Sequence, residues 1–482
     1  MEWVIVTIYC VAFGYIFLFS LGQLHLTWKY LRASKKVTPK TKVVKEWPYV
    51  TVQLPIYNEK YVAERLIKTI AEFDYPIDKL EIQVLDDSDD DTTRLIKEAI
   101  SSLNSSLDIS LIRREERKGF KAGALAHGLT TAKGEFIAIF DADFIPGKDF
   151  LKKTIPHFQA NTGVVQTRWG HINKDYSLLT KLQAFALDAH FTIEQTGRSF
   201  SNSFINFNGT GGVWRKECII DAGGWSDDTL TEDLDLSYRA QLKGWKFEYL
   251  EDCFAPAELP VIMPSIKSQQ YRWNKGAAES ARKNLPKVLK SGIGFVNKIH
   301  ATFHLLNSAV FICLFVAALL SIPMLLIKDN HPAMVTLYYL GGIFMMGFGS
   351  IALFYWVSAK KSANGGDTWY FLKIFPLFLI VSMGLSLHNG IAVLEGLLGF
   401  KTPFIRTPKF NVVSKGDSWK ENSYISLKLT PLTFIEGLLA LYFAGGVVFG
   451  IMIHDLTMVP FHIMMTLGFG AVFYYTVRPR YA

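Results

Sequence analysis

Residues 137–146, IAIFDADFIP, end an apolar, strand-prone run with two aspartates one residue apart, Asp141 and Asp143. Because side chains alternate along a strand and its extension, both carboxylates point to the same side, and their charges repel unless a positive group lies between them. A divalent cation is the simplest such group. The alternative is that one aspartate starts a turn while the other is solvated. The pair alone leaves both interpretations open.

A candidate base lies in TEDLDLSYRAQLKGW (231–245), which predicts an amphipathic helix with acidic residues in its first turn. Asp233 suits this role because the positive end of a helix favours an ionised carboxylate, and deprotonating a hydroxyl requires one. The alternative is an acidic helix start that only complements the helix dipole.

A third stretch, SQQYRWNKGA (268–277), concentrates Gln269, Arg272 and Trp273. The face of a tryptophan can stack on a sugar, and a guanidinium offers a fork of donors to diphosphate oxygens. The alternative is a basic amphipathic helix on a membrane surface, and the two interpretations are compatible.

The elements that must position these residues alternate between strand and helix. Strand patterns occur at 49–56, 81–88, 109–114 (ISLIRR) and 135–140. Strands separated by helix patterns predict an α/β domain with a mostly parallel sheet and a ligand site beyond the carboxyl ends of the strands. Asp86 and Asp87 close one of these strands, as Asp141 and Asp143 close another. The acidic residues are therefore expected at one edge of the sheet.

Two common nucleotide-binding sequences are missing from this domain. The first strand is not followed by GxGxxG, which argues against a dinucleotide Rossmann domain, and the absence of GxxxxGK[ST] excludes a P-loop. The phosphates of a nucleotide must then be held another way. A metal ion on the DAD sequence would bridge a diphosphate and stabilise it as a leaving group.

The composition indicates a membrane protein. Of the 482 residues 50% are hydrophobic and only 20% are charged, and the mean hydropathy is +0.19. One apolar block opens the chain and others fill residues 301–477, whereas residues 48–290 have the character of a soluble domain. The first block begins MEWVIV without basic residues and lacks a small-residue cleavage site, so we expect an anchor and not a cleaved signal.

The basic residues indicate which side of the membrane the middle of the chain occupies. The net charge is +8, but the basic residues cluster beside the apolar blocks, which favours a membrane surface over a nucleic acid as the partner. The run that follows the first block without an intervening acid is Lys29, Arg32, Lys35, Lys36, Lys40, Lys42 and Lys45. The positive-inside rule places this side in the cytoplasm. The four cysteines show neither metal-type spacing nor a disulfide framework.

The later apolar blocks predict further crossings. Spans near 301–327, 333–357, 432–453 and 457–477 are each long enough for a bilayer core, which takes about 20 residues. The segment 369–398 is too short for two crossings yet has basic flanks on both sides, so it is expected at the interface or as a re-entrant segment. Together with the first block this predicts five crossings, with the N-terminus outside and the C-terminal tail inside.

The ordered set LPIYNE, LDDS, DAD, FNGTGG, TED and QQYRW, over about residues 50–275, resembles the processive family-two glycosyltransferases. These are membrane β-polysaccharide synthases with a GT-A domain, and include bacterial cellulose synthase catalytic subunits. FNGTGGVWRKE and TEDLDLSYRAQLKGWKFEYL look closest to the cellulose-synthase-like glucomannan mannosyltransferases and xyloglucan-backbone glucan synthases. The resemblance implies an anchor (1–30), a cytoplasmic GT-A domain (48–260), an interfacial helix (261–300) and a transmembrane region (301–482) with a gating loop (399–431).

The resemblance also implies roles for particular residues. It assigns Asp233 as the base for in-line, inverting attack by an acceptor hydroxyl, and Asp141 and Asp143 as the site of Mg²⁺ or Mn²⁺. Nucleotide-sugar contacts fall to Tyr57, Asn58, Glu59, Asp87, Lys121, Asp141, Asp143, Gln269, Arg272, Thr407 and Lys409. Acceptor contacts fall to Phe207, Asn208, Gly209, Thr210, Glu232 and Trp273.

FIRTPK (404–409) resembles the gating-loop sequence FxVTxK of this family, with Arg406 in place of valine. Thr407 and Lys409 remain to cap a diphosphate, whereas the contact at position 406 is left open. Without the resemblance, this basic loop between apolar blocks would be interpreted as a cytoplasmic linker.

The expected function is transfer of sugar units from UDP-glucose or GDP-mannose to a growing β-linked polysaccharide, with a β-1,4 linkage expected. The expected location is the bacterial inner membrane or the Golgi. Trp273, the gating loop and aromatic residues in the C-terminal spans favour a processive enzyme, in which dimerisation or the re-entrant segment completes the channel. The alternatives are a non-processive glycolipid transferase of the ceramide-glucosyltransferase type and a catalytically silent membrane scaffold.

Overall fold

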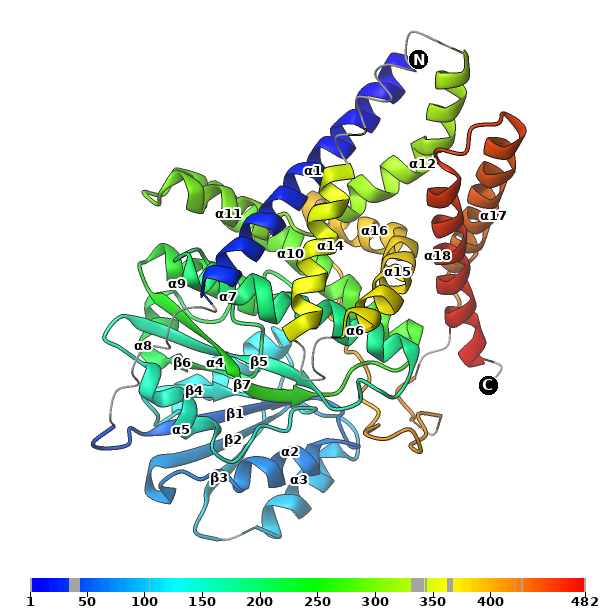
Figure 1. The fold of residues 1–482 in the computed structure, drawn as a ribbon. Helices are drawn as coiled ribbons and strands as arrows, with labels where there is room; N and C mark the ends of the chain where they lie inside the picture. The colour runs from blue at the N-terminus through cyan, green and yellow to red at the C-terminus, as the bar shows by residue number, and fades with distance from the viewer. Residues whose placement is uncertain are drawn as a thin grey trace.

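The computed structural model describes residues 2–33, 44–103, 105–330, 342, 345–361, 367–420, 422–425 and 428–480. Two parts stand out in Figure 1: a sheet covered by helices, and a set of long apolar helices that lie together on one side of it. Lys35, Lys36, Lys40 and Lys42 of the basic run lie outside the described residues. The first part of the expected span 333–357 lies outside them too.

Within the described residues, seven strands form one sheet in the order β3-β2-β1-β4-β6-β5-β7. The strands are β1 (Val50–Ile56), β2 (Leu80–Asp86), β3 (Asp108–Ile112), β4 (Phe136–Ile139), β5 (Thr162–His171), β6 (Gly212–Arg215) and β7 (Lys246–Ala257). Strand β6 is antiparallel to both of its neighbours, and every other pairing is parallel. The prediction of a mostly parallel α/β sheet is confirmed, and the four strands expected from the sequence are β1, β2, β3 and β4.

Helices cover both faces of the sheet, and on the second face of β1 and β2 the buried residues are polar and pair with each other: Thr51 donates to Glu81 at 2.6 Å and Gln53 to Gln83 at 3.0 Å. Val50, Val52 and Leu54 of β1 are fully buried beneath α2 (Ala63–Ala71), together with apolar residues of β2. On the other face, Ile137 and Ile139 of β4 pack with residues of α4 (Phe120–Thr131) and α9 (Glu232–Leu242). This double cover is typical of parallel sheets and explains why β4 is a continuous apolar run.

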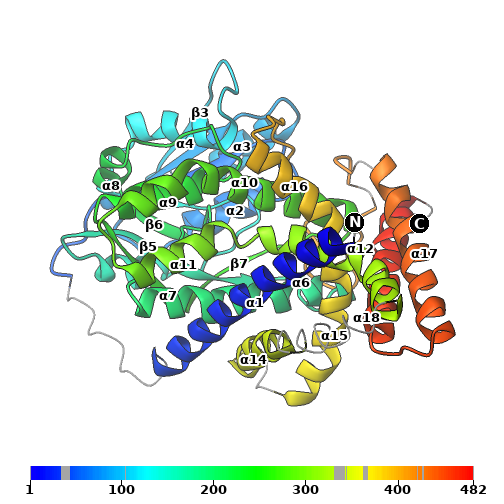
Figure 2. The same ribbon diagram turned by 90° about the horizontal axis from the view of Figure 1, so that it is seen from above.

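The remaining helices of the domain are short. They are α3 (Thr92–Ser101), α5 (Phe150–Thr154), α6 (Leu178–Ala189), α7 (Thr196–Phe200) and α8 (Lys216–Asp221), with a π-helical segment at His190–Gln195 between α6 and α7. The chain then enters α10 (Met263–Lys290), a 28-residue helix that contains QQYRW. Helix α10 packs along α16 (Ser386–Leu398), as Figure 2 shows, and thereby connects the sheet domain to the apolar helices.

The apolar helices are α1 (Glu2–Ala33), α11 (Phe295–Leu305), α12 (Ala309–Asn330), α14 (Met345–Lys361), α15 (Thr368–Gly384), α16, α17 (Pro431–Met452) and α18 (Val459–Val477). Two ion pairs, one buried and one partly buried, join α17 and α18 to the rest. Lys267 of α10 lies 2.6 Å from Glu436 of α17, and Lys328 of α12 lies 2.6 Å from Asp455 between α17 and α18. Burying a charge is costly unless it is paired, so these contacts fix how the helices pack.

Among the described residues, α1, α12 and α17 are long and apolar enough to cross a membrane, and the bent pair α15–α16 would make a fourth candidate. The expected span at 301–327 begins later, at Ala309, because a turn at 306–308 separates α11 from α12. The segment 369–398 bends by 51° between α15 and α16, a shape that suits the predicted re-entrant or interfacial segment. The five crossings and their orientation stay a prediction.

Candidate active site

A cavity opens at the carboxyl ends of β1, β2 and β4, where the acidic residues were expected. It is bordered by the ends of these strands, the first turn of α9, the first half of α10 and the loop that follows α16. The predicted site residues that line it are Tyr57, Glu59, Asp87, Lys121, Asp141, Asp143, Asn208, Gly209, Glu232, Asp233, Gln269, Arg272, Trp273, Thr407 and Lys409. Segments more than 300 residues apart in the chain therefore converge on one place.

The two aspartates of the DAD sequence are each paired with a lysine. Lys121 Nζ donates to Asp141 Oδ1 at 2.6 Å, and Lys409 Nζ donates to Asp143 Oδ2 at 2.8 Å. Burial acts to lower the pKa of both lysines, but the neighbouring carboxylates outweigh it and raise the pKa. Both lysines are therefore charged at neutral pH, and the positive groups beside the aspartates are side chains of the protein itself.

Asp143 retains capacity for a further ligand. Its side chain is 3% exposed, and its Oδ1 atom is buried without a hydrogen-bond partner. No group of three or more His, Cys, Asp or Glu side chains in the described ranges is arranged to hold a metal ion. Mg²⁺ and Mn²⁺ commonly bind through one or two carboxylates and complete their coordination with substrate phosphates. Asp141 and Asp143 fit such a site, in which the nucleotide supplies the remaining ligands.

Asp233 lies at the start of α9, near Lys121 and therefore near Asp141. Burial and the adjacent Glu232 carboxylate raise the pKa of Asp233 to about 7, against smaller opposing effects of Lys121 and the backbone N–H groups of the helix start. Burial likewise raises the pKa of Glu232. The sequence led us to expect a helix terminus that favours the ionised form. Burial is the larger effect, and it leaves Asp233 poised near neutrality, as a general base requires.

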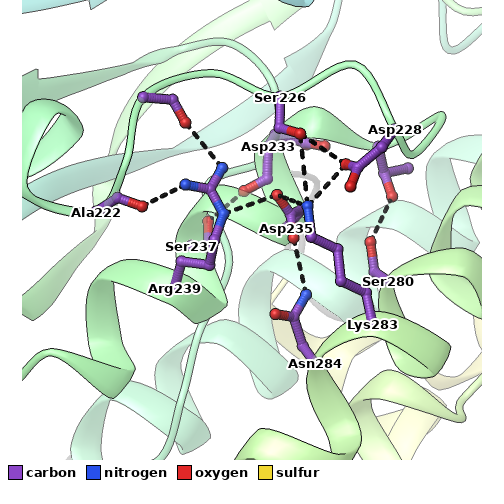
Figure 3. A network of polar contacts seen from close by, with 12 residues as sticks. Ala222, Ser226, Asp228, Asp233, Asp235, Ser237, Arg239, Ser280, Lys283 and Asn284 are labelled. Carbon is purple, nitrogen blue, oxygen red and sulfur yellow. Dashed lines mark hydrogen bonds and ion pairs between the residues drawn. The ribbon is translucent and has the colours of Figure 1, made fainter.

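A buried polar network behind Asp233 holds α9 against α10 (Figure 3). Asp235 is fully buried, and its carboxylate accepts hydrogen bonds from Arg239 Nε at 2.8 Å, Lys283 Nζ at 3.0 Å and Asn284 Nδ2 at 2.9 Å. Ser237 Oγ donates to the carbonyl oxygen of Asp233 at 2.6 Å. Asp235 and Arg239 belong to α9 and the other two donors to α10, so the network fixes the base relative to the helix of QQYRW.

Gln269, Arg272 and Trp273 extend from the first half of α10 into the cavity. Arg272 donates to Thr407 Oγ1 at 3.0 Å, and its guanidinium lies 4.7 Å from the ring centre of Phe404. Burial lowers the pKa of Arg272 while nearby carboxylates raise it, but an arginine remains charged. A guanidinium is thus available beside the DAD aspartates for diphosphate oxygens.

The loop of residues 399–430 covers this side of the cavity. Arg406 Nη1 lies 2.6 Å from Glu59 Oε2, and the guanidinium also stacks 4.5 Å from the ring centre of Tyr424. Glu258, after β7, accepts hydrogen bonds from the backbone N–H groups of Phe410 at 2.8 Å and Asn411 at 2.9 Å. Arg406, the residue that departs from FxVTxK, therefore attaches the loop to the sheet domain through an ion pair that valine cannot form.

Around Tyr57 the cavity wall combines an aromatic ring with a carboxylate and an arginine, and a second arginine behind the wall holds the carboxylate. Asp87 is held by the guanidinium of Arg114, whose Nε lies 3.0 Å from Asp87 Oδ1 and whose Nη2 contacts Oδ2. The guanidinium of Arg117 stacks 3.3 Å from the ring centre of Tyr57. A planar ring flanked by polar groups of both signs suits a nucleobase, which has flat faces and an edge of donors and acceptors.

Three of the expected contact residues do not line the cavity. Asn58 turns toward Asp89, to which its Nδ2 donates at 2.7 Å, because a positive φ of 53° directs its side chain away. Phe207 is fully buried against Trp214. Thr210 is also buried and accepts a hydrogen bond from the backbone N–H of Asp141 at 2.9 Å. Phe207 and Thr210 therefore support the site from beneath, because the FNGTGG segment passes from the core to the cavity wall.

Other lining residues were not anticipated: Arg117, Trp169, His171, Arg406 and Glu258. Arg406 was noticed only as a departure from a pattern. Trp169 and His171 occur in QTRWGH, at the end of a strand whose aromatic residue and histidine resemble core residues in sequence. Only their position after a strand, at the carboxyl edge of the sheet, could have marked Trp169 and His171 as site residues. That inference needs β5 to be predicted first, and β5 was not among the strands expected from the sequence.

Known proteins resemble this chain at the levels of family, sequence and fold. Residues 48–276 match the family described as "Glycosyltransferase like family 2". "Probable glucomannan 4-beta-mannosyltransferase 4" of Oryza sativa subsp. japonica is 43% identical over 365 residues, which are 73% of this chain and 63% of the relative. "Glucomannan 4-beta-mannosyltransferase 1" of the same plant is 40% identical over 298 residues, 58% of this chain and 56% of the relative. The chain thus spans less than two thirds of the length of these curated relatives.

A solved structure supports the fold. "Mannosyltransferase PcManGT from Pyrobaculum calidifontis in complex with GDP-Man and Mn2+" superposes with a TM-score of 0.56 at 20% identity and covers 83% of this chain and 99% of its own. At this identity the likeness concerns the fold alone. Together with the family match it confirms the expected GT-A architecture with additional apolar helices.

Proposed function

Residues 48–276 are a family-two glycosyltransferase domain with the GT-A fold, and from this premise we propose that the chain extends a β-linked polysaccharide with sugar units from a nucleotide sugar. The observation that carries the proposal is the convergence of Asp233, the DAD aspartates and Trp273 on one cavity. A base, a diphosphate site and an acceptor platform are the three parts that glycosyl transfer to a hydroxyl requires.

Asp233 is the base in this proposal. The acceptor sugar stacks on Trp273 and directs a hydroxyl at Asp233, which takes the proton as the oxygen attacks the anomeric carbon of the donor. The attack displaces the nucleoside diphosphate in line, so an α-linked donor gives a β-linked product. Partial burial beside Glu232 at the start of α9 keeps the pKa of the Asp233 carboxylate near neutrality, which suits proton transfer at physiological pH.

The diphosphate leaves with negative charge, which the cationic side chains around the DAD sequence stabilise. Arg272, Lys121 and Lys409 all lie within this wall of the cavity. On arrival of the nucleotide, Lys121 and Lys409 exchange part of their contact with Asp141 and Asp143 for phosphate oxygens. A bound Mg²⁺ or Mn²⁺ on Asp141 and Asp143 would neutralise further charge on the diphosphate.

We further propose GDP-mannose as the donor and a β-1,4-linked mannan-type chain as the product. Support comes from the names of the relatives that are 43% and 40% identical, both glucomannan 4-β-mannosyltransferases. UDP-glucose is the alternative donor. The catalytic domain faces the cytoplasm in this proposal, because the basic residues that follow α1 favour that side.

A donor panel tests the proposal. Purified full-length protein in detergent receives GDP-mannose, GDP-glucose, UDP-glucose and UDP-N-acetylglucosamine, each radiolabelled, with Mg²⁺ or Mn²⁺. We expect ethanol-insoluble label from GDP-mannose. Label that moves into a chloroform-soluble product carrying one sugar would support the glycolipid transferase instead, and absence of any transfer or hydrolysis with every donor would support the scaffold.

A further inference from the structure

A chain of hydrogen bonds links α1 to the wall of the cavity through the π-helical segment His190–Gln195. Gln23 of α1 donates to Glu194 Oε1 at 2.7 Å, and Glu194 Oε2 lies 2.7 Å from His190 Nδ1. The second ring nitrogen of His190, Nε2, lies 3.2 Å from Asn208 Oδ1. Asn208 lines the cavity, whereas His190 contacts it from behind. π-Helical turns are rare and often occur at functional sites.

Backbone atoms fix the orientation of the Asn208 amide. Gln195 Nε2 donates to the carbonyl oxygen of Asn206 at 3.1 Å and to the side-chain Oδ1 of Asn206 at 3.3 Å. The amide nitrogen of Asn206 therefore points the other way and donates to Asn208 Oδ1 at 2.9 Å. Because a backbone carbonyl only accepts, this order of donors and acceptors cannot be reversed. Asn208 thus presents its amide oxygen to His190.

His190 lies between two hydrogen-bond acceptors, the carboxylate of Glu194 and the amide oxygen of Asn208. Burial acts to raise the pKa of Glu194, but His190 and the nearby Arg198 outweigh it and hold the pKa below its usual range. The carboxylate is therefore ionised and has no proton to donate. A neutral imidazole has one N–H donor, whereas an imidazolium has two. Satisfying both contacts requires the protonated ring.

Glu194 is the carboxylate that contacts this ring. Arg198, which lies near Glu194, donates to the carbonyl oxygen of His300 at 3.2 Å. The other charged and titratable side chains on the elements that pack around the pair are His304 of α11, Tyr355 of α14, and the ion-paired Arg168 of β5, Asp188 of α6 and Glu251 of β7. The ion pair with Glu194 is thus what retains a proton on His190.

Asn208 precedes the turn that carries the backbone past the proposed base. Gly209 adopts a φ of +78°, and a Cβ atom at this position would lie 3.3 Å from Asp233 Oδ2. The carbonyl oxygen of Gly209 accepts a hydrogen bond from Lys121 at 2.9 Å, and the same ammonium group donates to Asp141 at 2.6 Å. A shift of Asn208 therefore moves the backbone against both the base and the lysine. A misplacement of about 1 Å can lower a rate by about 10²-fold.

We propose that His190 is a positioning residue, whose protonated ring holds the Asn208–Gly209 turn against Asp233. The inference rests on the proposed function, because it takes Asp233 as the base. When the ring loses a proton at high pH, the remaining N–H stays on the ionised Glu194, which is the stronger acceptor. The lone pair of Nε2 then faces Asn208 Oδ1, and the contact that holds the turn is lost. A group that acts in its protonated form supports the rate at lower pH and ceases to do so as the pH rises.

The pH dependence of kcat, measured with purified full-length protein in detergent, tests this role. The protein receives GDP-mannose, β-1,4-mannotriose and Mg²⁺ from about pH 6 to about pH 9.5. We expect kcat to rise as Asp233 ionises and to fall again on the alkaline side of the optimum. Burial acts to lower the pKa of Lys121 and Lys409, but neighbouring carboxylates outweigh it, so both stay charged over this range. The fall is therefore not due to these lysines.

Glu194→Gln is the decisive variant. Its amide nitrogen would donate to Nδ1 of a neutral His190, whose Nε2–H then donates to Asn208, while its oxygen still accepts from Gln23. We expect the alkaline fall to disappear, with kcat at the optimum within about threefold of the native value.

Two further variants separate this role from general effects of substitution. His190→Leu removes the contact at every pH, so it should lower kcat at least about tenfold and show no alkaline fall. His127→Gln replaces an exposed histidine of α4 and serves as the matched control, which should change neither kcat nor the fall. GDP affinity, measured by calorimetry, identifies variants that are misfolded.

Nitrogen NMR of isotope-labelled histidines reads the charge of the ring without relying on turnover. The signals that are missing from His190→Leu identify the residue, and we expect two protonated ring nitrogens at neutral pH and one at the alkaline end. If Glu194→Gln loses GDP affinity, His190→Leu and the NMR result decide. A neutral ring at neutral pH, an unchanged kcat in His190→Leu, or an alkaline fall that persists in folded Glu194→Gln would reject the role. Absence of transfer from every donor would reject the proposed function and this role with it, whereas normal transfer without an alkaline fall would reject the role alone.

Discussion

Arg406→Leu should release the loop of residues 399–430 from the sheet domain. The substitution removes the 2.6 Å ion pair with Glu59 and the stacking contact with Tyr424. Both charged side chains are mostly shielded from water, with 14% of Arg406 and 9% of Glu59 exposed. Breaking a buried ion pair costs about 3–5 kcal/mol, whereas an exposed surface pair contributes only about 0–1 kcal/mol.

Removing Arg406 leaves the Glu59 carboxylate without its ion-pair partner. The free energy that this costs is smaller than for most buried carboxylates. Burial raises its pKa to about 7 even in the presence of Arg406 and Lys409, so at neutral pH it takes up a proton readily once Arg406 is gone. We therefore expect about 2 kcal/mol of destabilisation of the closed loop, below the 3–5 kcal/mol typical of a broken buried pair. This corresponds to roughly a 30-fold larger open population.

Thiol labelling of a buried loop position measures this population. Val412 is fully buried in the closed loop, and Val412→Cys in a Cys10→Ser background places a thiol that reacts with maleimide only after opening. We expect the labelling rate to rise roughly 30-fold in Arg406→Leu. Lys415→Leu, which removes an exposed cation from the same loop, should leave the rate unchanged. Equal labelling rates with and without Arg406 would refute its role in holding the loop closed.

Three further predictions concern the catalytic groups. Asp143→Asn should weaken the binding of GDP in the presence of Mn²⁺, while the affinity for GDP without metal changes little. Calorimetry measures both affinities, and an equal loss in both conditions would oppose a metal site at Asp143. Transfer should fall as the pH drops below about 7, because the raised pKa of Asp233 leaves it protonated there and unable to accept a proton. A rate independent of pH between 5.5 and 8 would contradict this. Asp235→Asn should lower kcat with little change in GDP affinity, because it weakens the α9–α10 network behind the base, whereas the exposed Asp227→Asn should change neither.

The central elements of the domain could be predicted because local pattern and tertiary environment agree. The strand-prone, mostly apolar sequences of β1, β2 and β4 agree with their burial in a sheet that helices cover on both faces. The position of Asp87, Asp141 and Asp143 follows from the rule that ligands bind at the carboxyl ends of parallel strands. The sequence patterns were therefore sufficient for one wall of the cavity.

The other walls depend on contacts between distant segments. Nothing in the sequence near Glu59 indicates that its partner is Arg406, because an ion pair across 347 positions arises only from the path of the loop after α16. The motif FNGTGG marks the right segment, but burial decides that Phe207 and Thr210 face the core while Asn208 and Gly209 face the cavity. The pKa of Asp233 was likewise misjudged, because the helix terminus is visible in the sequence and the degree of burial is not.

The most direct test of the account is the linkage of the product made by the native chain and by Asp233→Asn. GDP-mannose labelled at the anomeric carbon is supplied with Mn²⁺ to each protein, and the product is analysed by NMR and by digestion with a β-1,4-mannanase. We expect an ethanol-insoluble, β-linked, mannanase-sensitive chain from the native protein. In Asp233→Asn we expect a loss of rate of about 10²–10⁴-fold with GDP affinity retained, the range typical of a general base. An α-linked product, or turnover by Asp233→Asn within about threefold of the native rate, would contradict the assignment of Asp233 as the base of an inverting β-glycan transferase.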